Sequence, residues 1–211
     1  KFKYIFVIRK DYESKAFRWY KKNGFIIVSK ILSFEKKINK SIIKKPNYEL
    51  LDNFNSFKKK GLILNKTFYN LNRKYDGYKK RDTKFWFNLK NHYYNRDYIF
   101  KILLLKESNN KHHYALIGKT KMRDNCFRFE ILEFCSSNIV YKKLLLDSIT
   151  YLAKKENCKK IRMKISIFDK FQDFLKKNKF KKNLETYILV KKLIKKNISL
   201  SNYKFFQTES I

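Results

Sequence analysis

The chain has 211 residues, of which 44% are hydrophobic, so it can bury one sizeable core, or one domain with part of another. Its formal net charge is +34. No apolar run approaches the ~20 residues needed to span a bilayer and no secretory signal is present, so we expect an intracellular protein without a membrane partner. Three cysteines without metal-ligand spacing favour buried thiols in a reducing compartment.

The positive charge has two interpretations, and the sequence leaves both open. Basic residues come as scattered pairs such as Lys21-Lys22 and Lys154-Lys155, in a chain rich in Lys, Asn, Ile, Phe and Tyr. This pattern favours a solvated surface of compositional origin. A basic surface also binds polyanions in a salt-sensitive manner, so nucleic acid or an acidic protein is the alternative partner.

The first 45 residues predict a strand, a helix and a second strand. Residues 2–9 are rich in β-forming side chains. Asp11 or Ser14 can cap the helix that follows, and Gly24 supplies the left-handed residue that ends it. Residues 26–34 are a second apolar strand. The chain begins at Lys1 rather than at a methionine, and we expect it to be part of a longer polypeptide.

The middle of the chain predicts helices and then a meander of three strands. Helical spacing over 47–60 is stopped by Gly61, and the short run 62–64 suits a strand. Further helices are expected over 67–75 and 82–93, with Asp82 as the cap of the second. The meander comprises 98–105, 113–120 and 126–134, joined by polar turns.

The last third predicts a helix, a strand, a helix and a strand. Residues 141–156 carry the clearest helical period, and they are followed by 161–165, 168–177 and 186–193. An antiparallel meander that leads into a β-α-β crossover indicates an α+β (mixed α/β) fold, a mixed sheet with helices on both faces.

A repeat links the two ends of the chain. Residues 18–25 (Arg-Trp-Tyr-Lys-Lys-Asn-Gly-Phe) recur, less completely, in Phe174–Phe180. The offset is constant at 155 and holds without a gap from Phe17/Gln172 to Ile38/Leu193. Two copies of one strand-helix-strand unit suggest two related domains, the first represented here only by its closing part.

The first copy resembles the GNAT family of acyl-CoA-dependent N-acetyltransferases. That family ends its core with a helix of the form Asn-x-x-Ala-x-x-x-Tyr-x-x-x-Gly-Phe, and here Ala16, Tyr20, Gly24 and Phe25 match while Glu13 replaces the asparagine. Residues 145–162 resemble the family's central helix and the strand after it. The resemblance therefore implies a tandem GNAT protein: residues 1–45 close a first domain, 46–198 form a second, degenerate domain, and 199–211 are a tail.

The resemblance implies transfer of an acetyl group from acetyl-CoA to a primary amine, without a metal. Tyr20 occupies the place of the general acid that protonates the CoA thiolate, and a phenol stays protonated at neutral pH. An aromatic ring packed on the core face of the helix is the alternative. The second copy has Leu175 there, which cannot donate a proton.

The resemblance also implies a glycine-rich pyrophosphate loop at the start of the central helix. Ile139 and Val140 fall on that loop in the second domain, where bulky side chains obstruct the approach that glycine permits. Lys142 and Lys143 could meet a phosphate, although a solvated pair is the simpler interpretation. By motif position, Glu13 and Ala16 are the cofactor contacts of the first domain.

Other polar residues give weaker signals. Glu130 or Glu133, on the third meander strand, would be a base by analogy with the family, but a carboxylate paired with neighbouring lysines is the favoured interpretation. His112 and His113 lie beside a predicted hairpin turn and are expected at the surface rather than in a metal site. The alternative function is a catalytically inactive, basic GNAT-fold module that binds nucleic acid or an acidic protein.

Overall fold

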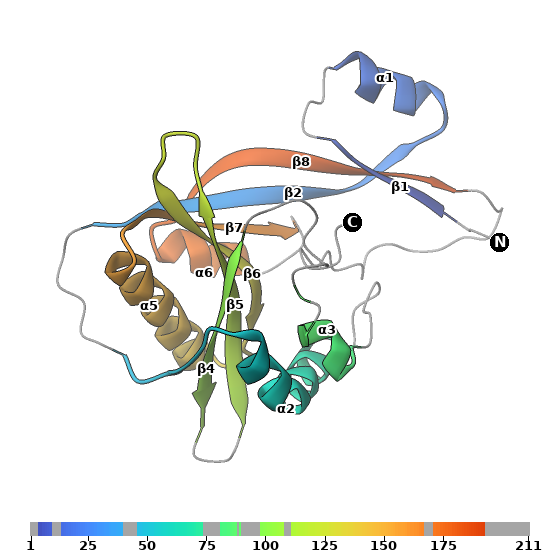
Figure 1. Cartoon of the computed structure of the whole chain (residues 1–211). Coiled ribbons are helices and arrows are strands. Elements are labelled where there is room, and N and C mark those ends of the chain that lie inside the picture. The colour runs from blue at the N-terminus through green and yellow to red at the C-terminus, as the bar shows by residue number, and fades with distance from the viewer. Residues whose placement is uncertain are drawn as a thin grey trace.

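In the computed structural model, one eight-stranded mixed sheet runs through the molecule and carries helices on both faces (Figure 1). The structure describes residues 4–9, 14–39, 46–73, 81–87, 89, 98–107, 111–166 and 171–192. The strands are β1 (Tyr4–Arg9), β2 (Ile26–Lys37), β3 (Glu49–Leu51), β4 (Ile99–Lys106), β5 (His112–Lys121), β6 (Phe127–Cys135), β7 (Cys158–Ser166) and β8 (Lys181–Lys192). The helices are α1 (Lys15–Lys22), α2 (Phe54–Asn72), α3 (Thr83–Phe87), α5 (Ile139–Lys155) and α6 (Phe171–Lys177).

The sheet order is β1-β8-β2-β7-β6-β5-β4-β3. Strands β4, β5 and β6 form the predicted antiparallel meander, and β6 and β7 are the parallel pair that α5 connects. Strand β3 adds to the edge of the meander by pairing with β4, which corrects the prediction of a helix at these residues. This arrangement confirms the predicted fold class. Among the described residues no helix is both long enough and apolar enough to cross a membrane.

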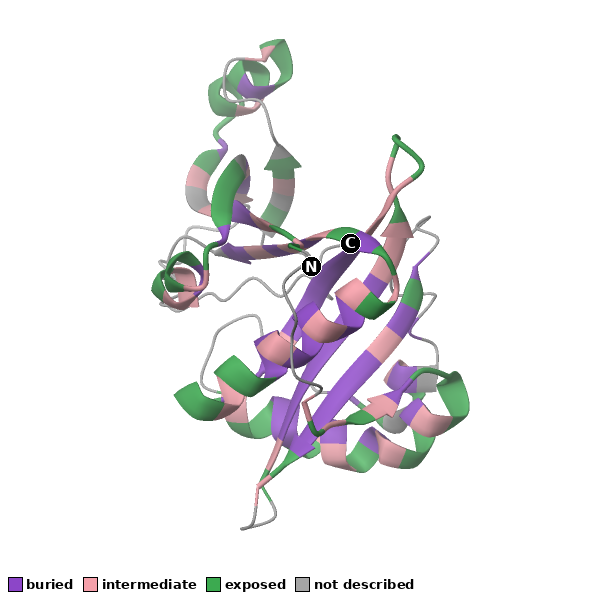
Figure 2. Ribbon diagram, turned by 90° about the vertical axis from the view of Figure 1, so that its left-hand side faces the viewer, coloured by how far each residue is buried: buried purple, intermediate pink, exposed green. Residues whose placement is uncertain are grey.

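Each face of the sheet has its own core, because side chains alternate along a strand. On β4, Leu103 and Leu105 face the cluster that contains Ile149 of α5 and Leu175 of α6. Ile102 and Leu104 face the other way, into the cluster built with α2 and α3. Figure 2 shows the buried central strands between these helices.

Residues 54–72 form a single helix, which corrects the prediction of two helices with a strand between them. Asn53 starts the helix by a reciprocal capping box with Ser56. A buried stripe then continues across Gly61, which is itself buried, and Leu62 points outward with 76% of its surface exposed. A glycine inside a helix costs only ~1 kcal/mol, less than the burial that the continuous stripe provides.

The two strand-helix-strand units are related by a pseudo-two-fold axis. The units are β1-α1-β2 and β7-α6-β8. The first strand of each unit pairs with the second strand of the other, β1 with β8 and β7 with β2, while β2 and β8 pair at the centre. Ile31 pairs with Thr186, and these two residues are each other's equivalents at the offset of 155. The axis therefore passes through this pair.

The symmetry extends to the irregularities of the central ladder. The pair Ile27–Leu189 maps onto Phe34–Lys182 when the offset is applied to both residues. The register shift that skips Val28 on β2 is matched by a second shift that skips its equivalent, Asn183, on β8. The repeat predicted from the sequence is thus confirmed in the hydrogen-bonding register.

Both helices of the repeat also end in the same way. In each, the second residue after the helix has a positive φ, +79° at Gly24 and +65° at Lys179, and two backbone N–H groups donate back into the last turn. An asparagine side chain adds a third bond to a carbonyl oxygen. The N–H of Phe25 donates to the carbonyl of Tyr20 (3.1 Å), as that of Phe180 donates to Leu175 (3.0 Å). The N–H of Gly24 donates to the carbonyl of Lys21 (3.1 Å), as that of Lys179 donates to Lys176 (2.9 Å). The side-chain amide of Asn23 donates to the carbonyl of Trp19 (2.9 Å), as that of Asn178 donates to Phe174 (2.8 Å).

Candidate active site

The parallel strands β6 and β7 pair over only the first part of their lengths. The paired segments are Phe127–Ile131 and Cys158–Met163, whereas β6 continues to Cys135 and β7 to Ser166. A bulge lies where the pairing ends: on β5, Ile117 faces Ile131 and Leu116 faces Glu133, so Leu132 is the extra residue.

The first carboxylate beside this bulge belongs to Glu133, whose side chain is 3% exposed. It forms an ion pair with the guanidinium of Arg81 and accepts a hydrogen bond of 2.7 Å from the Tyr114 hydroxyl. The Arg81 guanidinium in turn lies over the rings of Phe68 and Phe85, 3.6 Å and 4.1 Å from their centroids.

Tyr114 is fully buried next to this ion pair. Burial, followed by the thiol of Cys135 and the carboxylate of Glu133, raises the pKa of Tyr114 well above its usual value. The phenol therefore remains a donor to Glu133. Glu133 is thus part of a buried network that joins it to Arg81 and Tyr114.

The second carboxylate, Glu130, lies on the same face and is fully buried. It accepts hydrogen bonds from Arg162 Nη2 at 2.6 Å and from Tyr98 Oη at 2.7 Å, and Arg128 Nη2 lies 3.7 Å away. Burial opposes its ionisation, but Arg162 and the Tyr98 hydrogen bond outweigh burial and lower the pKa of Glu130 to about 2. Both carboxylates are thus ion-paired, as predicted, but their closest partners are arginines rather than lysines.

The amino end of α5, which follows the bulge, does not fit a pyrophosphate. The Asn138 side chain accepts the Val140 N–H at 2.8 Å, so one of the free donors of the first turn is already used. Ile139 and Val140 belong to the helix rather than to a loop, and 62% and 59% of their surfaces are exposed over its first turn. No glycine is present in this segment to let a phosphate approach the backbone.

The two lysines of this turn have protein partners. Lys143 Nζ lies 3.0 Å from Asp147 Oδ1 and 3.3 Å from Asn178 Oδ1, and Lys142 Nζ lies 5.4 Å from the centre of the Phe171 ring. These contacts give the lysines a structural role on the surface of α5. Their assignment as phosphate ligands stays a prediction.

His113 is buried, in contrast to the expected surface position. It is 3% exposed, its Nε2 lies 2.5 Å from Glu107 Oε1, and its ring stacks on Tyr141 at 4.4 Å between centroids. The sequence placed it beside a turn, but Glu107, directly after the end of the partner strand β4, gives the buried imidazole a polar partner.

Tyr20 lies in a separate cluster. Its ring packs on Trp19 and Phe25, with centroids 5.2 Å and 5.0 Å apart, beside the buried pair Phe17 and Leu189. Its equivalent in the other unit, Leu175, is completely buried.

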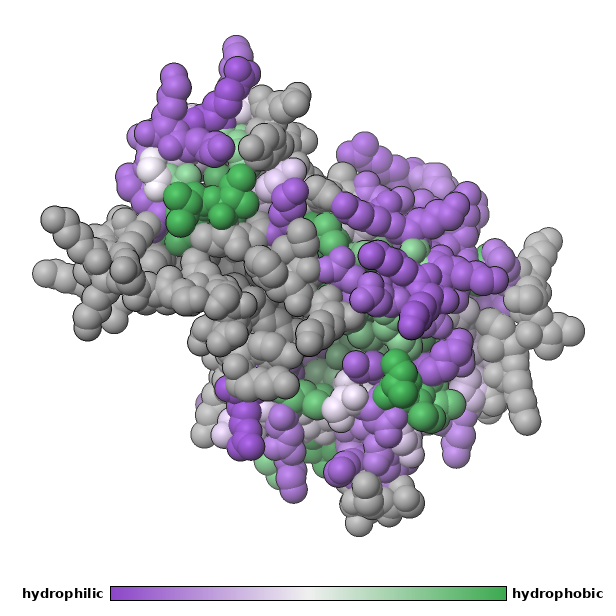
Figure 3. Space-filling model, turned by 180° about the vertical axis from the view of Figure 1, so that it is seen from behind, coloured by the Kyte–Doolittle hydropathy of each residue, from purple (hydrophilic) through white to green (hydrophobic). Residues whose placement is uncertain are grey.

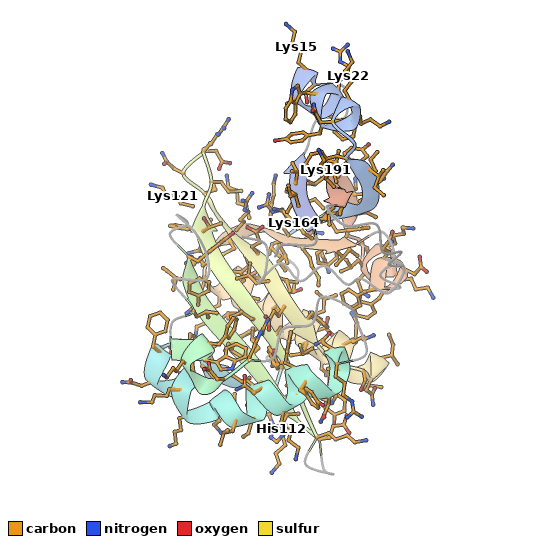
Figure 4. All side chains as sticks on the ribbon, turned by 90° about the vertical axis from the view of Figure 1, so that its right-hand side faces the viewer. Lys15, Lys22, His112, Lys121, Lys164 and Lys191 are labelled. Atoms are coloured by element: carbon orange, nitrogen blue, oxygen red, sulfur yellow. The ribbon has the colours of Figure 1, made fainter. Side chains whose placement is uncertain are left out.

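The fold does not bring Tyr20 to the parting strands. Strands β8 and β2 lie between β1 and β7 in the sheet. Cys135, at the end of β6, pairs with Tyr114, which lies two residues from His112 on β5. Figure 4 shows His112 at the opposite end of the molecule from the helix Lys15–Lys22. Of the predicted cofactor contacts of the first domain, Ala16 is exposed on α1 and Glu13 lies outside the described residues.

Solved structures share this architecture. A GCN5-related N-acetyltransferase from Anabaena variabilis aligns with a TM-score of 0.55 at 15% identity, over 88% of this chain and 45% of its own. One from Sphaerobacter thermophilus aligns with a TM-score of 0.59 at 11% identity, over 94% of this chain and 62% of its own. An Enterococcus faecalis protein described as a probable N-acyltransferase aligns with a TM-score of 0.59 at 11% identity, over 89% of this chain and 44% of its own.

The chain thus spans between about two fifths and two thirds of the length of these proteins. Neither a protein-family model nor a curated protein sequence matches it. The chain has the fold of the GCN5-related N-acetyltransferases.

Proposed function

We propose that the chain is the C-terminal part of a GNAT-type N-acetyltransferase, which moves an acetyl group from acetyl-CoA to a primary amine. In this proposal residues 1–45 close a first, catalytic domain and residues 46–198 form a second, non-catalytic one. The observation that supports it is one difference between the two equivalent strand-helix-strand units. The first unit has a partly buried tyrosine, Tyr20, at the position where the second has the buried Leu175.

A non-catalytic second domain accounts for the groups around its parting strands. Glu130 and Glu133 are ion-paired in the core, and the amino end of α5 is capped by Asn138 and covered by exposed aliphatic side chains. A site that must bind a phosphate and remove a proton needs free N–H donors and a base. Among the described residues at that place, both carboxylates are ion-paired and Asn138 already uses one N–H donor of α5.

Tyr20 would act in the first domain by holding a proton on its phenolic oxygen. Bound acetyl-CoA supplies the activated acyl group as a thioester. The amine nitrogen bonds to the carbonyl carbon, the carbon–sulfur bond breaks, and the amine's proton leaves to a base or to water. Tyr20 Oη would then donate its proton to the departing thiolate, as the resemblance implies.

Replacement of this hydroxyl tests the proposal. We expect Tyr20→Phe, in the protein expressed from its full reading frame, to lower the rate of acetyl-CoA consumption with a primary amine about 10²-fold or more. Tyr187→Phe is the matched control, because Tyr187 packs against Phe17 in the same cluster. A Tyr20→Phe rate that equals the wild-type rate at every pH would remove Tyr20 from the chemistry.

A polyanion-binding module is the second candidate, and α1 is the observation that favours it. Trp19 is 58% exposed, and Lys15, Arg18 and Lys22 are exposed on the same short helix. Figure 3 shows hydrophilic side chains over much of one face of the molecule. Submicromolar binding of a single-stranded oligonucleotide that survives ~0.2 M salt and is lost in Trp19→Ala would support this candidate, since non-specific contacts weaken steeply over that range.

A further inference from the structure

We propose that the outer edge of β1 and the adjoining face of the sheet, on the side of α1, receive a parallel strand followed by a helix. We assign this strand and helix to a segment of the same polypeptide that precedes β1. The proposal rests on the tandem organisation proposed above, but not on the acyl-transfer chemistry. It follows from comparing the two edges of the pseudo-symmetric strands β1 and β7.

The register fixes which residues of β1 and β7 are equivalent. Tyr4 pairs with Lys192 on β8, and Lys160 pairs with Lys37 on β2. Lys192 and Lys37 are themselves equivalent at the offset of 155. Residues 4–9 therefore correspond one by one to residues 160–165, so that Ile5 matches Ile161 and Val7 matches Met163.

The outer edge of β7 is occupied within this chain. Strand β6 pairs with it in parallel, joining Phe129 to Ile161 and Ile131 to Met163, and α5 follows β6. Ile161 shares a core cluster with Ile149 of α5. The equivalent edge of β1 is the end of the sheet and carries no strand among the described residues.

Side-chain burial shows what is missing at β1. Ile161 is 0% exposed, whereas its equivalent Ile5 is 43% exposed. Leu175 is 0% exposed and belongs to the cluster of α5, whereas its equivalent Tyr20 is only partly buried. The positions that lie under α5 in one unit are the ones left uncovered in the other, while Phe25 and its equivalent Phe180 are buried in both.

The comparison with β7 also indicates which kind of strand pairs with the outer edge of β1. A second copy of this chain that pairs through β1 about a two-fold axis would place its strand antiparallel to β1. The strand that occupies the equivalent edge of β7 is parallel and brings a helix with it. We therefore expect the incoming strand to pair with Tyr4–Val7 and to part from β1 at Ile8, as β6 parts from β7 after Met163.

This pairing would complete the surroundings of Tyr20. In the second domain the residue equivalent to Tyr20 lies in the core beneath the helix that follows the parallel strand. The incoming helix would cover Tyr20 in the same way, and the new pair of parting strands would lie next to it. The incoming strand and helix would thus form the side of the Tyr20 site that is exposed at the edge of β1.

Lysine substitution at matched isoleucines tests the proposal in the protein expressed from its full reading frame. We expect Ile5→Lys to lower the melting temperature by ~5 °C or more, because it would bury a charge beneath the incoming helix. Ile99→Lys is the control: Ile99 is also a strand isoleucine, 57% exposed, and should change the melting temperature by less than ~2 °C.

Hydrogen–deuterium exchange on the wild-type protein gives a second readout that needs no variant. We expect the amides of residues 4–7 to be protected at the same level as those of residues 160–163. Fast exchange over residues 4–7, an Ile5→Lys variant as stable as Ile99→Lys, or a dimer that Ile5→Lys converts to a monomer would each overturn the proposal. A loss of acetyltransferase activity alone would leave it intact, since neither readout depends on catalysis.

Discussion

The carboxylate of Glu130 offers the sharpest test of the buried polar network. Its pKa is lowered from 4.5 to about 2 in the folded protein, against the effect of burial, because Arg162 and the Tyr98 hydroxyl stabilise the anion. A carboxylate with a lowered folded-state pKa contributes its full stabilisation above the unfolded pKa and loses it as the pH falls towards the folded pKa. The shift corresponds to roughly 3 kcal/mol.

We expect Glu130→Gln to destabilise the protein by about 3 kcal/mol near neutral pH, because Arg162 and Arg128 lose their anionic partner. For a chain of this size the melting temperature should fall by roughly 6–12 °C. Glu49→Gln is the matched control, since Glu49 has a side chain that is 46% exposed and pairs with Lys60 at 3.0 Å. A surface pair of that kind is worth no more than ~1 kcal/mol.

The assay is urea unfolding of the wild type and both variants between pH 6 and pH 3. The free-energy difference between wild type and Glu130→Gln should shrink as the pH drops below 4.5, because the wild-type carboxylate then gains little from remaining ionised. A difference that stays constant over this range would refute the assignment of a strongly lowered pKa to Glu130. A Glu130→Gln effect as small as that of Glu49→Gln would refute the buried ion pair itself.

Three further predictions concern single positions. Lys179 has φ +65°, so Lys179→Gly should raise the free energy of unfolding by up to ~1 kcal/mol in a urea titration. Gly24→Ala, at the equivalent position (φ +79°), should lower it by a similar amount. Two changes of the same sign would contradict the matched helix ends. A Cβ at Gly118 would lie 2.6 Å from Tyr98 Cδ1, so Gly118→Ala should cost ~1–3 kcal/mol, and a neutral result would mean that the Tyr98 ring is free to move. Burial raises the pKa of Cys158 to about 11, so at pH 8 its thiol should alkylate well after that of the less buried Cys126; the reverse order would contradict the structure.

The sequence predicts the elements of this fold better than their partners. The meander strands and α5 follow from hydrophobic period alone, and the helix end at Gly24 follows from its glycine. The sequence divides helix α2 at Gly61, because a glycine inside a helical pattern also signals an end, and only the buried stripe on both sides of it decides the question. The strand exchange between β1 and β8 joins residues at opposite ends of the chain, and no local pattern specifies it.

The candidate site was predictable in kind but not in detail. Glu133 was expected to be ion-paired, but its partner Arg81 comes from a distant segment whose own sequence carries no sign of burial. The repeat was the most informative pattern, because its constant offset of 155 predicted two related strand-helix-strand units. The structure adds that their second strands, β2 and β8, pair with each other about Ile31 and Thr186. Tyr20 followed from its motif, but the structure places it beside a sheet edge rather than beside the parting strands β6 and β7.

The most direct test of the account is the footprint of acetyl-CoA on amide exchange in the protein expressed from its full reading frame. If the cofactor belongs to the first domain, acetyl-CoA should slow exchange in the peptides that cover residues 5–9 and 16–25. Exchange over residues 132–142 and 164–166, where β6 and β7 part and α5 begins, should stay unchanged. Protection of residues 132–142 with none near Tyr20 would contradict the account, because it would place the cofactor in the domain that we consider non-catalytic.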